Sequence, residues 1–189
     1  ENIKIDFPAN CFYEDFKLQY SQGDISSKGY SHVHQIHNGY TPIHKFFTVS
    51  IKAQNLKPRY YDKVVVTRWG RSEGGFYKDG FVTARSKYFG KFYLNIDSVP
   101  PGISLYNIYT GTNTSRYSTL LVTIGDTLSG IDTYKTYIDD KFIVMEYDYK
   151  SGFLRHKFEK SLESGEHKFE IIVRDRRGNE NRKQVNFIR

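Results

Sequence analysis

The feature that most constrains this chain is an alternation of apolar and polar residues with a period of two, which recurs along its whole length. One face of an extended segment, for example, would carry Phe47, Val49, Ile51 and Ala53. Successive side chains of a strand point to opposite faces, so this pattern predicts half-buried β-strands. No stretch keeps a helical period beyond about two turns, and at most one helical turn is expected, around Ser161 to Gly165.

In the first half of the chain, turns rich in glycine separate the predicted strands. These strands are expected over residues 12–20, 47–53, 61–69, 80–88 and 90–96. The segments between them include SQGD, HNGY, EGG and KDG, whose Gly, Asn and Asp residues favour chain reversal. Only 38% of the residues are hydrophobic, but sixteen Tyr and fourteen Phe favour strands and bury a large area each. Sheets can therefore supply a core.

The sequence changes character at DSVPPG, residues 97–102, where two prolines bias their predecessors toward extended backbone. Beyond this connector, strands are predicted over 103–108, 119–126, 131–139, 141–148, 153–158, 167–175 and 183–188. Short strands spaced by roughly ten residues are typical of an immunoglobulin-like sandwich. We therefore predict an all-β chain of two tandem immunoglobulin-like β-sandwich domains, residues 1–96 and 97–189.

Charge and cysteine content restrict the environment. A net charge of +7 favours an anionic partner such as nucleic acid, an acidic glycan or a bacterial envelope. The basic residues are interspersed with acidic ones and no nucleic-acid recognition motif is present, so no nucleic-acid partner is predicted. The single cysteine, Cys11, excludes an internal disulfide, and its apolar neighbours predict a small buried thiol. No apolar run approaches the ~18 residues of a membrane helix, so no membrane span is predicted.

Several segments, taken in order, carry a resemblance to a known family. They are FPANCFYEDFKLQY, TPIHKFF, FGKFYLNIDSVPPGI, SGIDTYKTYIDDKFIVMEYDYKSG and SGEHKFEIIVRDRRGN. In this order they resemble the non-catalytic, immunoglobulin-like C-terminal region of lysostaphin-type (LytM-like) zinc endopeptidases of Gram-negative bacteria, over almost the whole chain. In the last segment, Asp175 is expected to accept hydrogen bonds from the amides of its turn, and Gly178 to take a positive φ.

The resemblance implies a function. The chain would be the accessory region of a secreted cell-wall peptidase, located in the periplasm or cell envelope, with peptidoglycan or another envelope glycan as partner. The catalytic domain of that family lies upstream in the same protein, which agrees with a chain that begins at Glu1 without an initiator Met. The alternative is a stand-alone carbohydrate-binding or adhesive surface module.

Four of the six histidines fall within SHVHQIHNGYTPIH, residues 31–44. His32 and His34 are spaced H-x-H, so on a strand both imidazoles would face one side and could share a zinc ion. The resembled family also needs an H-x-x-x-D pair, and neither this motif nor H-E-x-x-H occurs. We therefore predict no catalytic residues and no metal site, with His32 and His34 as the only metal candidates, in a polar segment that is expected to be solvated.

Carboxylates gather in IDDKFIVMEYDYK, where they could serve hydrolysis or hold calcium. No D-x-D-x-D-G loop is present, so Asp139 and Asp140 are interpreted as a hairpin turn. Glu146 and Asp148 are then expected on the outer face of the next strand. No phosphate-binding loop, dinucleotide fingerprint or G-x-S-x-G elbow occurs either, and no cofactor is predicted.

The surplus of aromatic residues suggests a sugar-stacking surface, because planar rings on an exposed sheet face pack well against sugar rings. The predicted ligand-binding residues are Tyr60, Tyr61, Trp69, Arg68 and Arg71. Tyr77, Tyr88 and Tyr93 are further candidates for the same stacking surface.

Overall fold

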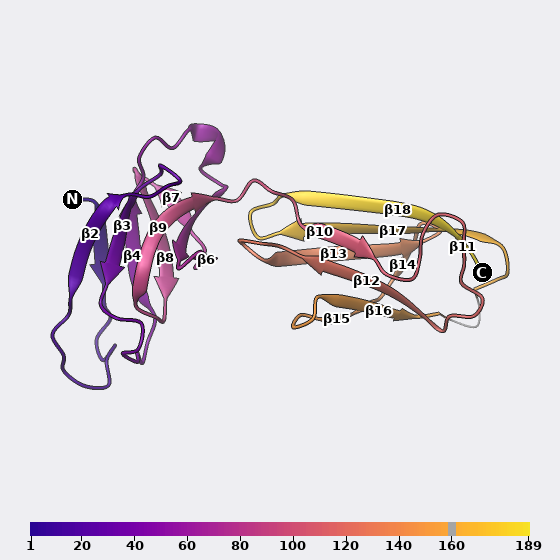
Figure 1. Ribbon diagram of the computed structural model, residues 1–189, viewed down its shortest axis with the longest axis horizontal. Coiled ribbons are helices and arrows are strands. Elements are labelled where there is room, and N and C mark those ends of the chain that lie inside the picture. Colours follow the sequence, from indigo (N-terminus) through magenta and orange to yellow (C-terminus); the bar gives the residue numbers. More distant parts are fainter. Residues whose placement is uncertain (159–161) are drawn as a thin grey trace. The chain divides into compact units, whose positions relative to one another are not determined.

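The computed structural model describes residues 1–158 and 162–189, and the chain divides into two compact units, Glu1–Ser98 and Val99–Arg189. Each unit contains one four-stranded and one five-stranded sheet (Figure 1). Within the described residues, the one helical element is a short 3-10 turn, η1 (Pro58–Tyr60). The prediction of an all-β chain is confirmed.

The N-terminal unit pairs its strands antiparallel throughout. Its strands are β1 (Ile3–Asp6), β2 (Tyr20–Ile25), β3 (His32–Ile36), β4 (Phe47–Lys52), β5 (Val64–Arg68), β6 (Arg71–Ser72), β7 (Phe76–Lys78), β8 (Phe81–Ser86) and β9 (Gly90–Ile96). One sheet has the order β1-β4-β8-β7 and the other β2-β3-β9-β5-β6. Phe47, Val49 and Ile51 of β4 are all fully buried, so the predicted apolar face is the core face.

The prediction of a strand over residues 12–20 is wrong. Strand pairing begins only at Tyr20, and Phe12 forms an isolated bridge with Ile43. The alternating aromatic residues of this segment pack as a cluster instead: the ring centroids of Phe12 and Phe16 lie 4.9 Å apart, and both rings contact Phe89. Packing of Phe12 and Phe16 over the core, rather than a sheet ladder, accounts for these two positions of the alternation. The predicted buried thiol is confirmed, because Cys11 is 2% exposed.

The C-terminal unit has the strand order of an immunoglobulin domain. Its strands are β10 (Gly102–Leu105), β11 (Thr112–Asn113), β12 (Thr119–Gly125), β13 (Ile131–Ile138), β14 (Lys141–Ile143), β15 (Glu146–Asp148), β16 (Phe153–Lys157), β17 (Glu166–Asp175) and β18 (Glu180–Ile188). The order β10-β12-β16-β15 corresponds to immunoglobulin strands A, B, E and D, and β18-β17-β13-β14 to G, F, C and C′.

One predicted strand of this unit is divided. Residues 141–148 form β14 and β15, which belong to different sheets, with the buried Met145 between them. The chain crosses from one sheet to the other here, and the side chain of Met145 enters the core at the crossing. Ser161, the first residue of the predicted helical turn, lies outside the described residues, and Leu162 to Gly165 have no helical structure.

The N-terminal unit differs from this order by one strand. Its sheet β1-β4-β8-β7 follows the A, B, E, D pattern, and β9, β5 and β6 take the F, C and C′ positions. The place of strand G, beside β9, is occupied by β3, which comes from earlier in the chain and is antiparallel to β9. The histidine-rich segment is therefore an inner strand of the five-stranded sheet, flanked by β2 and β9.

Candidate ligand-binding site

The H-x-H pair lies on β3 and is used by the fold. His34 is fully buried, and its Nδ1 atom is 3.0 Å from the hydroxyl oxygen of Tyr20. His32 is partly buried, with its Nδ1 atom 3.0 Å from the carbonyl oxygen of Gly23. The prediction of a solvated segment is thus wrong for His34, because the neighbouring strand β9 places it in the interior.

Burial has a direct effect on the chemistry of His34. Desolvation of the charged imidazolium lowers the pKa of His34 to about 4, and the neighbouring His32 acts in the same direction. His34 is therefore neutral at neutral pH. Within the described residues, no third His, Cys, Asp or Glu gathers with these two side chains, whereas a catalytic zinc site needs three protein ligands.

The remaining histidines of the stretch also make structural contacts. The Nε2 atom of His37 is 2.9 Å from the hydroxyl of Thr41, and its ring packs against Phe16 and Phe89 at centroid distances of 4.8 and 5.3 Å. His44 packs edge-on against Tyr13. Packing and loop geometry account for both side chains.

The carboxylate-rich segment of the C-terminal unit forms the expected turn. Asp139 and Asp140 both have positive φ and connect β13 to β14 as a two-residue hairpin loop, while Glu146 and Asp148 are exposed on β15. The Oδ2 atom of Asp139 lies 2.6 Å from Nδ1 of His167. The other ring nitrogen of His167 is 2.9 Å from the carbonyl oxygen of Glu163, so both nitrogens are engaged. The contact between Asp139 and His167 stabilises the turn, and with both of its nitrogens engaged the ring is not arranged as a general base.

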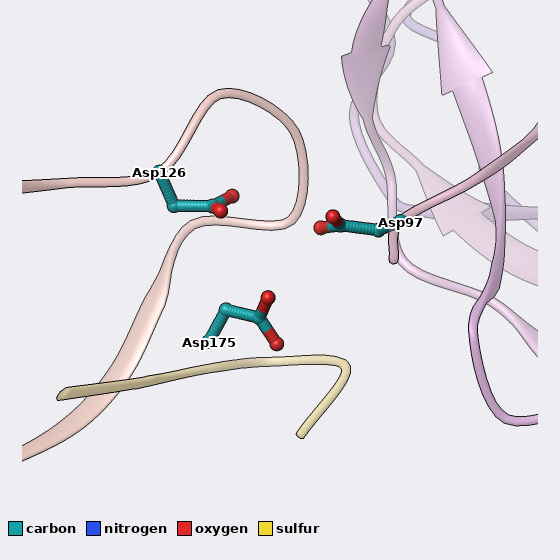
Figure 2. Close-up of side chains that lie close together, drawn as sticks. All are labelled: Asp97, Asp126 and Asp175. Carbon is teal, nitrogen blue, oxygen red and sulfur yellow. The ribbon is translucent and has the colours of Figure 1, made fainter. Parts of the chain in front are cut away.

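A second pair of carboxylates, Asp126 and Asp175, lies where two turns of the C-terminal unit come close together. Asp126 and Asp175 have carboxylate oxygens within 4.8 Å of each other (Figure 2). Asp126 accepts hydrogen bonds from the backbone N–H groups of Leu128 and Gly130, and Asp175 from those of Arg177 and Asn179. The role predicted for Asp175, and the positive φ of Gly178, are confirmed. Asp97, also labelled in Figure 2, follows β9 in the N-terminal unit, where it is buried.

The predicted ligand-binding residues fall into two groups at opposite ends of β5. Tyr60 and Tyr61 precede the strand, whereas Arg68, Trp69 and Arg71 lie at its end and in the following hairpin. Tyr61 stacks on Tyr77 with ring centroids 3.8 Å apart, and the guanidinium of Arg59 lies over Tyr60. The structure therefore does not bring all five residues into one surface.

Trp69 has an unusual backbone conformation, and its side chain packs against two glycines. It is 56% exposed and has a φ of 48°, followed by Gly70 at 82°, in a two-residue hairpin loop where Asn-Gly is the usual sequence. A bulky residue in this conformation is a steric outlier whose strain is on the order of 1 kcal/mol. A methyl group on Gly39 would lie 2.5 Å from Cη2 of Trp69, and one on Gly90 would lie 3.3 Å from Cε2. Because Gly39 and Gly90 have no side chain, the indole of Trp69 can pack directly against their backbone atoms.

Arg68 connects Trp69 to a second exposed ring. Its guanidinium lies 4.8 Å from the ring centroid of Tyr88 and 5.7 Å from that of Trp69. Its Nε atom donates a hydrogen bond to Oε1 of Glu73 at 2.7 Å, which fixes the side chain. We call Trp69, Arg68 and Tyr88, with their support Gly39 and Gly90, the Trp69 platform. Sequence reasoning found Arg68, Trp69 and Tyr88 but missed Glu73 and the two glycines, whose contacts join segments far apart in the chain.

The position of the Trp69 platform within its unit follows from β9. Gly90, beneath the indole, begins this strand, and Ile96 ends it immediately before Asp97. Seven residues of strand span on the order of 20 Å. The platform therefore lies at the end of the N-terminal unit that is remote from the point where the chain continues.

Comparison with known proteins identifies the family of the N-terminal unit. Residues 1–97 match the model of the Zu5-like domain, and the chain belongs to this family. Among curated proteins, no sequence matches. A solved structure described as fibronectin(III)-like modules of CbhA from Clostridium thermocellum is similar at 14% identity and a TM-score of 0.36, covering 76% of this chain and 85% of that chain. A similarity of this size transfers no function.

The single helical turn among the described residues is far shorter than a membrane span requires.

Proposed function

We propose that this chain is a non-catalytic accessory region of a secreted cell-wall metallopeptidase and that it contacts peptidoglycan through the Trp69 platform. Its role would be to position an associated catalytic domain at the bacterial envelope. The ordered motifs that resemble lysostaphin-type endopeptidases support the first part of this proposal. The exposure and rigid support of Trp69 are the observation that carries the second part.

Neither burial nor turn propensity accounts for a tryptophan at position 69. More than half of its surface is exposed, and the loop position favours Asn, Asp or Gly. Backbone strain retained at an exposed site points to a functional role. A rigid indole loses little conformational freedom on binding, and its flat face is suited to the apolar face of a sugar ring.

Charge supports an anionic cell wall as the partner. The N-terminal unit contains fourteen Lys and Arg residues against nine Asp and Glu residues, so it carries five of the seven net positive charges of the chain. Such an excess attracts a protein to a polyanionic surface, and the attraction weakens as salt rises. Stacking on Trp69 would add a contact that depends little on salt.

The non-catalytic role is supported by how the histidines are used. His34 is buried, and His37 and His167 have contacts that hold loops. A lysostaphin-type zinc site would need the H-x-x-x-D partner motif that the sequence lacks. Zinc-dependent cleavage of peptidoglycan by this chain alone would contradict the proposal.

The test is retention of the purified chain on insoluble peptidoglycan at low and moderate salt. We expect binding that survives moderate salt and that Trp69→Ala weakens by about tenfold or more, since an aromatic stacking contact contributes ~1–3 kcal/mol. Tyr149→Ala is the matched control, because Tyr149 is 75% exposed in the C-terminal unit and outside the platform. Equal loss in both variants, or binding that moderate salt abolishes, would count against the Trp69 platform as the contact.

The exposed indole also favours a second candidate, a stand-alone carbohydrate-binding or adhesive module. The two proposals differ in what accompanies the chain in its full-length gene product. An H-x-x-x-D followed by a second H-x-H before Glu1 would support the peptidase accessory region. A signal peptide directly before Glu1 would support the stand-alone module.

A further inference from the structure

The hairpin that carries Trp69 contains an unfavourable charge pair. Arg68 and Arg71 are directly opposite each other across β5 and β6. Side chains at opposed positions of an antiparallel pair lie on the same face, and like charges there are destabilising. Only Arg68 is compensated, through its ion pair with Glu73. Arg71 has no such ion pair among the described residues.

The two arginines have different environments. The side chain of Arg68 is 17% exposed, held by Glu73 and packed between the rings of Trp69 and Tyr88. Arg71 is exposed, and none of the ion pairs among the described residues involves it. Arg68 thus acts as a fixed spacer between two rings, whereas the guanidinium of Arg71 is available to a ligand two residues from the indole.

We propose that the Trp69 platform is a subsite for a sugar ring that carries an acidic group, with the ring on Trp69 and the acidic group on Arg71. This inference rests on the proposed function and specifies its ligand class. A guanidinium can donate two parallel hydrogen bonds to a carboxylate or a phosphate, which selects for an anion by geometry as well as charge. A neutral glycan could stack on the indole but would leave the charge of Arg71 uncompensated.

The test uses the single tryptophan of the chain as its reporter. Because Trp69 is the only Trp, its fluorescence responds to ligand at the platform without interference. The probes are glycan strands of alternating N-acetylglucosamine and N-acetylmuramic acid freed of peptides, phosphomannan, and neutral chitohexaose. We expect the acidic strands to bind about tenfold more tightly than chitohexaose at moderate salt, as charge-assisted hydrogen bonds do. Comparison with phosphomannan shows whether a carboxylate or a phosphate is preferred.

Two variants with the same change of charge make the test specific. Arg71→Gln is expected to bring the affinity for acidic strands down to that for chitohexaose and to leave chitohexaose binding unchanged. Arg59→Gln removes an equal charge beside Tyr60, at the other end of β5, and is expected to preserve the preference. An equal loss in both variants would overturn the inference, because it would mean diffuse attraction. Tighter binding of single-stranded oligo(dT) than of the acidic strands would overturn it as well.

The outcome also separates this inference from the proposed function. If the chain is retained on insoluble peptidoglycan but binds acidic and neutral glycans equally, the proposed function stands and the acidic subsite is wrong. If the chain neither is retained nor shows a fluorescence response to any glycan probe, both fail.

Discussion

The two units of this chain build similar sandwiches from strands in different order. In the C-terminal unit the strand beside β17 is the last in the chain, β18, whereas in the N-terminal unit the strand beside β9 is β3. The chain continues from β9 into the next unit, so the strand that completes the sheet comes from before β4 instead. That strand is the histidine-rich segment, and its place beside β9 explains why His34 is a core residue rather than a ligand.

Each unit also holds a histidine whose pKa is shifted, and the two respond to acid in opposite directions. Burial lowers the pKa of His34 to about 4. Burial would lower the pKa of His167 too, but hydrogen bonds to the Asp139 carboxylate and the Glu163 carbonyl outweigh it and raise that pKa. His34 therefore lowers the stability of the N-terminal unit in acid, whereas His167 contributes to the stability of the C-terminal unit in acid. Burial decides the direction of the shift at His34, and the hydrogen-bonded Asp139 carboxylate and Glu163 carbonyl decide it at His167.

The largest expected effect tests whether the units unfold separately. Phe92 and Phe169 are fully buried in the cores of the N-terminal and C-terminal units. Replacement of either by Ala should cost about 3–5 kcal/mol of its own unit's free energy of unfolding. Denaturation followed by Trp69 fluorescence reports the N-terminal unit, so Phe92→Ala should shift that transition and Phe169→Ala should not. Equal shifts of the fluorescence transition would show that the cores unfold together.

The second prediction concerns acid and the N-terminal unit. With a pKa of 6.5 unfolded and about 4 folded, His34 takes up a proton in the unfolded state first, so stability is retained above pH 6.5 and lost as pH falls to 4. The expected loss is roughly 3 kcal/mol. Urea denaturation followed by Trp69 fluorescence measures it. His34→Leu should flatten the pH dependence, whereas the exposed His44→Leu should leave it intact; an unchanged slope in His34→Leu would refute the assignment.

The smallest expected effect tests the pairing of Asp139 with His167 in the C-terminal unit. Desolvation would raise the pKa of Asp139, but hydrogen bonds from His167 and the Lys168 amide outweigh this effect and lower that pKa. The Asp139 contribution is lost as pH falls through that lowered pKa, and the His167 contribution is lost as pH rises through its raised pKa, so the pair stabilises most at mildly acidic pH. Asp139→Asn keeps a residue that tolerates positive φ and should cost about 1 kcal/mol near pH 5, and less near pH 9.

The neighbouring aspartate supplies the control for this measurement. Asp140 lies in the same turn, and its exposed carboxylate pairs with Lys168 at the surface. Asp140→Asn should change the free energy of unfolding by no more than about 0.5 kcal/mol. Circular dichroism of both variants across the pH range makes the comparison, and equal effects would remove the special role of the His167 partner.

Much of the fold could be predicted because its signals are local. The alternation in β4 and the run Gly90–Ile96 identify strands, and Asp139-Asp140 identifies a hairpin. Segments whose alternation had another cause were misinterpreted. In residues 12–20 the rings of Phe12 and Phe16 cover the core without forming a strand, and the break at Met145 marks a change of sheet that a periodic pattern does not reveal.

The sequence by itself determined an all-β chain, its turns, its positive charge and the presence of a cluster of aromatic and basic residues at Arg68 to Arg71. Only the tertiary structure decided that His34 lies in a core, that Tyr60 and Tyr61 are separated from Trp69, and that Trp69 rests on Gly39 and Gly90. The physical reason is that strand periodicity and turn conformation depend on neighbouring residues. Burial and ring contacts depend on which distant strands pair, and that choice is made by the packing of the whole sheet.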